Sequence, residues 1–93
     1  MSRFSAASQP RLRAGCRLSQ SPQQGDVLLI PEGVLRLVGP GRKIVERCDG
    51  SRNVADIIRE LQAEFASTDP ARIESEVLIF LERLHQKGVV ELA

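Results

Sequence analysis

The 93-residue sequence has few of the residues that metal sites and nucleic-acid surfaces usually need. It contains three phenylalanines and no tryptophan or tyrosine, which disfavours a platform of stacked rings for single-stranded nucleic acid. Cys16 and Cys48 lie far apart and, with the single histidine His85, do not make the four-ligand set of a zinc site. We expect reduced, partly buried thiols, with a disulfide as the alternative, and no metal or cofactor.

Long apolar runs and a strong net charge are also missing. No stretch of 18 apolar residues is present, and residues 1–15 lack the apolar segment of a secretory signal. We therefore expect a cytoplasmic protein that does not enter a membrane. The formal net charge is +1, which gives no overall field toward nucleic acid. Residues 1–25 carry four arginines and no acid, whereas residues 51–93 carry eight acids and five bases.

The combinations of residues that catalysis requires are not found in the sequence. The carboxylate nearest to His85 along the chain is Glu82, and the serines lack the context of a nucleophile elbow. The Gly-Pro-Gly segment at residues 39–41 lacks the spacing of a phosphate-binding loop. The sequence therefore predicts a protein that is not an enzyme.

The N-terminal half reads as a tail followed by strands. Residues 1–10, rich in Ser, Gln, Ala and Pro, are expected to form a flexible tail, and residues 11–93 one domain. Residues 11–18 alternate with period two, which is typical of a half-buried strand or an extended arm, and residues 19–25 read as a turn or loop. Residues 27–30 and 34–38 are two apolar runs around Pro31 and Gly33, and they predict a β-hairpin.

The C-terminal half has helical periodicity. Residues 42–48 predict a short helix, and Ser51 or Asn53 can cap a second helix whose apolar stripe begins at Val54. A third helix is expected from about Pro70 to Gly88, followed by a short strand over residues 89–92. The expected fold is α+β and winged helix-turn-helix-like, with an N-terminal β-hairpin or three-stranded sheet followed by three helices.

Two apolar residues of the third helix fall outside its core stripe. Leu78 lies to the side of the stripe and Ile79 nearly opposite it, and the expected stripe consists of Ile73, Val77, Phe80, Leu81 and Leu84. In one interpretation Leu78 packs against the hairpin and Ile79 is a stray exposed residue. In the other, both line a groove beside the edge of the hairpin, which would accept an extended peptide.

DNA binding is the alternative function, because a winged helix places its recognition helix in the major groove. Glu74, Glu76 and Glu82 on the third helix would oppose the phosphates, however. A winged-helix transcriptional regulator therefore remains the second hypothesis.

Residues 27–65 resemble the PqqD family of pyrroloquinoline quinone (PQQ) biosynthesis. The resemblance rests on the Leu-Leu-x-Pro-Glu-Gly hairpin, the Leu-Arg-Leu strand, Cys48-Asp49-Gly50 and the Val-x-x-Ile-Ile pattern from Val54. It continues more loosely to Lys87-Gly88. The sequence departs from the family at Val38, where Asn is frequent, and at Arg47, where an apolar residue is frequent.

The resemblance implies a RiPP recognition element, a peptide chaperone that is not an enzyme. Its partners would be the ribosomal precursor peptide PqqA and the radical SAM enzyme PqqE, which joins a Glu to a Tyr side chain. The peptide would add as a strand along residues 34–38 and pack on the third helix. A free sheet edge also permits a homodimer. The expected peptide-binding residues are Val34, Leu35, Arg36, Leu37, Val38, Leu78, Leu81 and Arg83.

Overall fold

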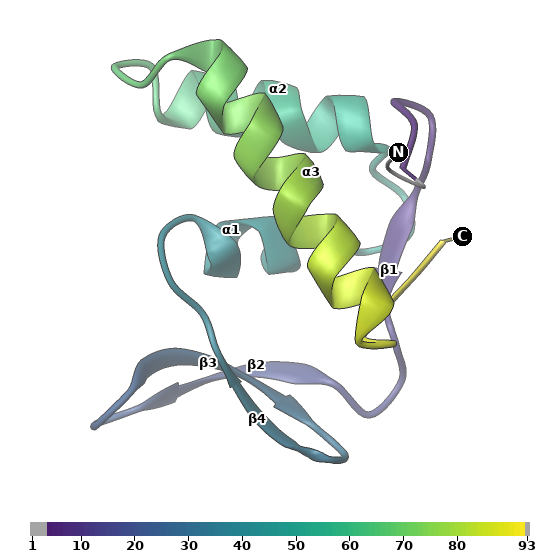
Figure 1. Cartoon of the computed structure of the whole chain (residues 1–93), viewed down its shortest axis with the longest axis vertical. Helices are drawn as coiled ribbons and strands as arrows, with labels where there is room; N and C mark the ends of the chain where they lie inside the picture. The colour runs from purple at the N-terminus through teal and green to yellow at the C-terminus, as the bar shows by residue number, and fades with distance from the viewer. Residues whose placement is uncertain (1–3, 93) are drawn as a thin grey trace.

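A computed structural model describes residues 4–92, and its order of elements matches the α+β expectation. Figure 1 shows a small sheet at one end of the molecule, with the helices stacked above it. The antiparallel strand order of this sheet is β2–β3–β4. Its strands are β2 (Arg17–Ser21), β3 (Gly25–Ile30) and β4 (Gly33–Arg36). A second, two-stranded sheet joins β1 (Pro10–Leu12) to β5 (Val90–Leu92).

The register of the three-stranded sheet sorts its side chains onto two faces. Leu28 pairs with Leu18 on one side and with Leu35 on the other, so these three residues share a face. Leu28 is fully buried, and Leu18 and Leu35 pack against the core that the helices form. The next pair, Leu29 and Val34, faces the opposite way. The predicted hairpin is confirmed, with Pro31 and Glu32 as its two-residue loop.

The three helices begin where the sequence provides caps. Asn53, one of the two expected caps, accepts a hydrogen bond from the Asp56 amide at 2.8 Å and starts α2 (Val54–Glu64). Asp69 caps α3 (Pro70–Gln86), whose first residue is the proline. The short helix α1 (Gly41–Glu46) follows the sheet directly. Their buried stripes are Ile44 and Val45 in α1; Val54, Ile57 and Leu61 in α2; and Ile73, Val77, Leu81 and Leu84 in α3.

The N-terminal segment differs from the expectation of a flexible tail. Phe4 is buried in the core, and the first turn of α2 holds the segment through two backbone bonds. The Val54 amide donates to the Ser8 carbonyl at 2.8 Å, and the Ala55 amide donates to the Ala6 carbonyl at 3.1 Å. The segment therefore supplies acceptors for amides that a helix start leaves without internal partners. Residues 1–3, also expected in the tail, lie outside the described part of the chain.

Residues 11–18 do not form the single strand that was one of the two expectations for this segment. Gly15, with φ of +91°, turns the chain between β1 and β2, so Leu12 and Leu18 belong to different sheets. The loop expected at residues 19–25 is shorter, because β2 runs to Ser21 and β3 begins at Gly25. The expected final strand is confirmed as β5, whose pairing with β1 brings the two ends of the described chain together (Figure 1).

Both cysteines are free thiols. Cys48 is buried, its Sγ donates to the Ile44 carbonyl at 3.3 Å, and burial raises the pKa of its thiol to about 12. Within residues 4–92, no three His, Cys, Asp or Glu side chains gather closely enough to hold a metal ion. None of the described helices has the length and apolar character needed to span a membrane.

Candidate functional site

Strand β4 forms an open edge of the three-stranded sheet. It is last in the strand order and pairs with β3 alone among the described strands. The Leu37 amide donates to the Asp26 carbonyl at 2.9 Å, which continues the ladder just past β4. Because amides of an antiparallel strand alternate in direction, those of Val34 and Arg36 point away from β3. The strand thus presents two outward amide donors at the edge.

A cavity of about 270 Å³ lies where the chain leaves this edge. Val38, 70% exposed, lines it from the sheet side, and Ile79, 59% exposed, lines it from α3. Val34 on β4 is 53% exposed, but it lies on the face of the sheet opposite to Leu28 and Leu35 and does not line the cavity. We call the surface that Val38 and Ile79 line the β4–α3 groove. The complete lining of its cavity is Val38, Gly39, Pro40, Ile44, Glu76, Ile79, Phe80 and Arg83.

Close packing between α1 and α3 builds the floor of the groove. A Cβ atom placed on Gly41 would lie 3.0 Å from Cε1 of Phe80, so only glycine allows this approach without a shift of the ring. The Phe80 ring therefore sits against the start of α1 and forms a wall of the cavity together with Ile44. Neither residue was among the expected site residues, because the contact depends on how two helices cross.

The expected peptide-binding residues divide into two groups. Val34, Arg36, Val38 and Arg83 are exposed, and Val38 and Arg83 line the cavity directly. Leu37 and Leu81 are 7% and 0% exposed and belong to the core, while Leu35 and Leu78 are half-buried and pack against it. Ile79, rather than Leu78, supplies the apolar surface of α3. The linings of the two cavities described here include none of these four leucines.

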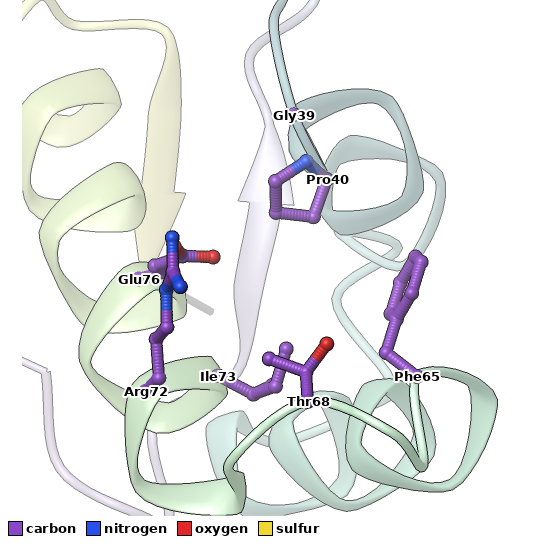
Figure 2. A pocket seen from close by; sticks show the side chains of 7 residues that line it. All are labelled: Gly39, Pro40, Phe65, Thr68, Arg72, Ile73 and Glu76. Carbon is purple, nitrogen blue, oxygen red and sulfur yellow. The ribbon is translucent and has the colours of Figure 1, made fainter.

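A second cavity, of about 350 Å³, adjoins the first. Gly39, Pro40 and Glu76 line both cavities. Figure 2 shows Pro40, Phe65, Thr68 and Ile73 around the hollow, with Arg72 and Glu76 beside each other on α3. The Nε atom of Arg72 donates to Oε1 of Glu76 at 3.2 Å. We call this one the Phe65 cavity.

Positive charge near the groove is not neutralised by ion pairs. Within residues 4–92, eight of the arginine and lysine side chains make an ion pair with an acid. Arg36 on β4 and Arg83 on α3 are exposed and make none within the described residues, and Arg83 lines the cavity. Their charges are available to carboxylates of a bound molecule.

The fold and this surface define a class: a small α+β domain with an open strand edge beside an apolar depression on its last helix. A family model described as "Coenzyme PQQ synthesis protein D (PqqD)" matches residues 26–90, and the chain belongs to the PqqD family.

Known proteins resemble the chain along nearly its whole length. A curated relative named "PqqA binding protein", from Xanthomonas axonopodis pv. citri (strain 306), is 42% identical and aligns over 99% of this chain and 100% of its own. The solution structure of the PqqD truncation of Methylobacterium extorquens PqqCD, described as a functional, stand-alone RiPP recognition element, has a TM-score of 0.80 at 34% identity, covering 97% of this chain and 96% of that one. The crystal structure of PqqD from Xanthomonas campestris has a TM-score of 0.56 at 38% identity, covering 95% and 94%.

Proposed function

We propose that the chain is a peptide chaperone of PQQ biosynthesis that binds the precursor peptide PqqA and presents it to the radical SAM enzyme PqqE. The observation that carries the proposal is the open edge of β4 beside the β4–α3 groove. The name of the curated relative and the RiPP recognition element described for the Methylobacterium protein support it. The chain itself would act by binding, in the cytoplasm where the precursor is synthesised, and would catalyse no step.

In this proposal the precursor adds to the sheet as a fourth strand. The outward amides of Val34 and Arg36 donate to its carbonyls, which gives affinity that depends little on sequence. Side chains on its inner face enter the groove beside Val38 and Ile79, and this contact selects for apolar residues. Leu35, Leu37, Leu78 and Leu81 contribute from beneath by holding the strand and the helix at a fixed separation.

The unpaired guanidinium groups add a preference for acidic peptides. Arg36 lies on the open strand and Arg83 lines the groove from α3, so both would attract carboxylates of an extended guest. Both are solvent-exposed, and the attraction weakens as salt shortens the Debye length, which is about 10 Å at 0.1 M. Binding should therefore be tighter at low ionic strength.

The Arg36→Pro variant tests strand addition. Proline removes the outward amide and leaves the ladder to β3 intact, because the Arg36 amide does not point toward β3. Arg36→Ala is the matched control, since it removes the same charge and keeps the amide. We expect Arg36→Pro to weaken binding of synthetic PqqA by roughly tenfold more than Arg36→Ala, as measured by calorimetry.

Circular dichroism checks that both variants are folded. If the folded proline variant binds PqqA as tightly as the alanine variant, the precursor does not pair with β4. Titration with random duplex DNA serves as a further control, and tight, salt-sensitive binding of DNA in place of peptide would favour the winged-helix regulator.

The same edge would also allow a second copy of the chain to pair with β4. A homodimer formed in this way would compete with the peptide, because both would use the outward amides of Val34 and Arg36. Light scattering over a range of protein concentrations, with and without peptide, measures this competition. Dissociation of a dimer by peptide is the expected result.

A further inference from the structure

The loop of the hairpin that carries β4 is tied to a distant part of the chain. Glu32, the second residue of this loop, accepts hydrogen bonds from Nη2 of Arg13 at 3.2 Å and 3.3 Å, one to each carboxylate oxygen. Figure 1 shows the loop on the same side of the molecule as the connection between β1 and β2, where Arg13 lies, and as the C-terminal end of α3. We propose that this ion pair, the Arg13–Glu32 clasp, positions the open edge of β4 for a guest peptide that it does not touch. This inference rests on the proposed function.

Arg13 is itself fixed to the end of α3. Its backbone amide donates to the Val89 carbonyl at 2.8 Å, which continues the pairing of β1 with β5. A Cβ atom placed on Gly88 would lie 3.5 Å from Nη1 of Arg13, so the guanidinium lies against the turn that follows α3. Because both the backbone and the side chain of Arg13 are held there, the clasp joins the hairpin loop to α3.

Pro31 adds a packing contact next to the ion pair. A Cβ atom placed on Gly15 would lie 3.4 Å from Cγ of Pro31, so the proline ring packs on the turn between β1 and β2. The hairpin loop is therefore held at two neighbouring residues, by apolar contact at Pro31 and by charge at Glu32. A change at Glu32 removes the charged contact and leaves the apolar one.

The other end of β4 is held by the core. Leu37 is 7% exposed, and the chain then enters α1 at Gly41, which lies against the Phe80 ring of α3. With the clasp at its start and Leu37 at its end, β4 keeps a fixed position relative to α3. A guest that pairs with β4 and packs on α3 needs both elements in place at once. Movement of the hairpin loop away from α3 would lower the fraction of molecules that can bind.

The charges of the clasp are used within the fold. Both oxygens of Glu32 accept from Arg13, and the linings of the β4–α3 groove and of the Phe65 cavity include neither residue. Their side chains are 30% exposed for Arg13 and 64% exposed for Glu32. Ion pairs as exposed as this one change an equilibrium constant by about fivefold at most, and salt weakens them. The clasp therefore adjusts affinity and does not create it.

The Glu32→Gln variant tests the clasp, because it removes the charge and keeps the length of the side chain. We expect it to bind synthetic PqqA about threefold more weakly at low salt. The loss should lie mainly in the association rate measured by stopped flow, because fewer molecules are ready to bind. Glu91→Gln is the matched control: it breaks an ion pair of comparable exposure, Arg11–Glu91, which joins β1 to β5 and not to the hairpin. The control should bind PqqA like the parent chain.

A charge swap distinguishes positioning from direct contact with the guest. The double variant Arg13→Glu with Glu32→Arg rebuilds the ion pair with its polarity reversed. Each single change should weaken PqqA binding, and the double variant should recover most of the affinity of the parent chain. A side chain that touched the guest through its own charge would gain nothing from the swap. Circular dichroism verifies that every variant is folded.

Amide relaxation dispersion measures the clasp without any peptide. In the free Glu32→Gln protein we expect exchange on the microsecond-to-millisecond timescale at Val34 and Leu35 of β4, with none at buried Ile57 of α2 as the reference. The parent chain and Glu91→Gln should show no such exchange at β4.

The outcomes separate the clasp from the proposed function. Equal affinity and association rate of Glu32→Gln and the parent chain would overturn the clasp and leave strand addition standing. Failure of the charge swap to recover binding would overturn it as well. If the parent chain does not bind PqqA, the proposed function fails, and the dispersion experiment alone then decides: a β4 without exchange in Glu32→Gln overturns the clasp, and exchange confined to β4 supports it.

Discussion

Two regions of the molecule use arginine in opposite ways. At the junction of α1 and α2, Arg47 donates to Glu60 at 2.9 Å, to Glu64 at 3.4 Å and to the Lys43 carbonyl at 2.9 Å. Arg52 also pairs with Glu60, so one network ties the two helices together. At the β4–α3 groove, by contrast, Arg36 and Arg83 are exposed and make no ion pair within residues 4–92. Paired charge holds the helices in place, and unpaired charge is left for a partner.

The apolar residues of α3 show the same division. Leu81 is completely buried in the core, while Ile79, two positions earlier on the same helix, faces solvent in the groove. Burial of Leu81 stabilises the fold whether or not a peptide is bound. Exposure of Ile79 contributes little to the stability of the folded chain and leaves its side chain available to a partner.

The largest effect on stability should come from a change to a buried residue of α3. Leu81→Ala leaves a cavity between the helices and is expected to lower the free energy of unfolding by about 2–5 kcal/mol. Ile79→Ala should change stability by less than about 0.5 kcal/mol and should weaken PqqA binding by roughly tenfold. Urea denaturation and calorimetry measure the two quantities. The assignment of Leu81 to stability and Ile79 to binding is contradicted if Ile79→Ala destabilises the protein as much as Leu81→Ala. It is also contradicted if Ile79→Ala leaves peptide binding intact.

The second prediction compares the two kinds of arginine directly. Arg47 is 18% exposed, and Arg47→Ala leaves Glu60 with Arg52 alone and Glu64 with Lys43 alone as ion-pair partners among the described residues. We expect a loss of about 1–2 kcal/mol of stability, less than for a fully buried charge pair because both acids remain partly solvated. Arg83→Ala should leave stability unchanged and weaken peptide binding at low salt. Equal stability losses in the two variants would contradict the claim that Arg47 stabilises the fold and Arg83 does not.

Sequence alone predicted the parts of the molecule whose signals are local. The stripes of α2 and α3 follow from three- and four-residue spacing, and Asn53 and Asp69 begin their helices by short-range hydrogen bonds. The hairpin at Pro31 is equally local. Together these elements were enough to predict an open strand beside an apolar helix.

The features that sequence missed depend on distant contacts. Phe4 is one ring in a polar segment, so no periodicity indicates that it packs in the core and meets the His85 ring edge-on at 5.6 Å. The partners of Arg47 lie 13 and 17 positions away, across a helix junction. The wall made by Phe80 at Gly41 requires the crossing of α1 and α3. Such contacts leave no pattern within a short window.

The smallest effect concerns pH and the same α1–α2 network. A hydrogen bond from Lys43 holds the pKa of Glu64 below its ordinary value, and backbone bonds from Arg52 and Ser51 do the same for the pKa of Asp49. A lowered folded-state pKa gives stability that is present above the unfolded pKa, about 4, and is lost as pH falls through the folded pKa. Urea denaturation from pH 7 to pH 3 should therefore show declining stability. Glu64→Gln should flatten part of that decline, whereas Glu74→Gln, an exposed site outside the network, should not. An unchanged slope in Glu64→Gln would mean that the carboxylate pairs just as well in the unfolded chain, and the network would then hold the helices through Glu60 alone.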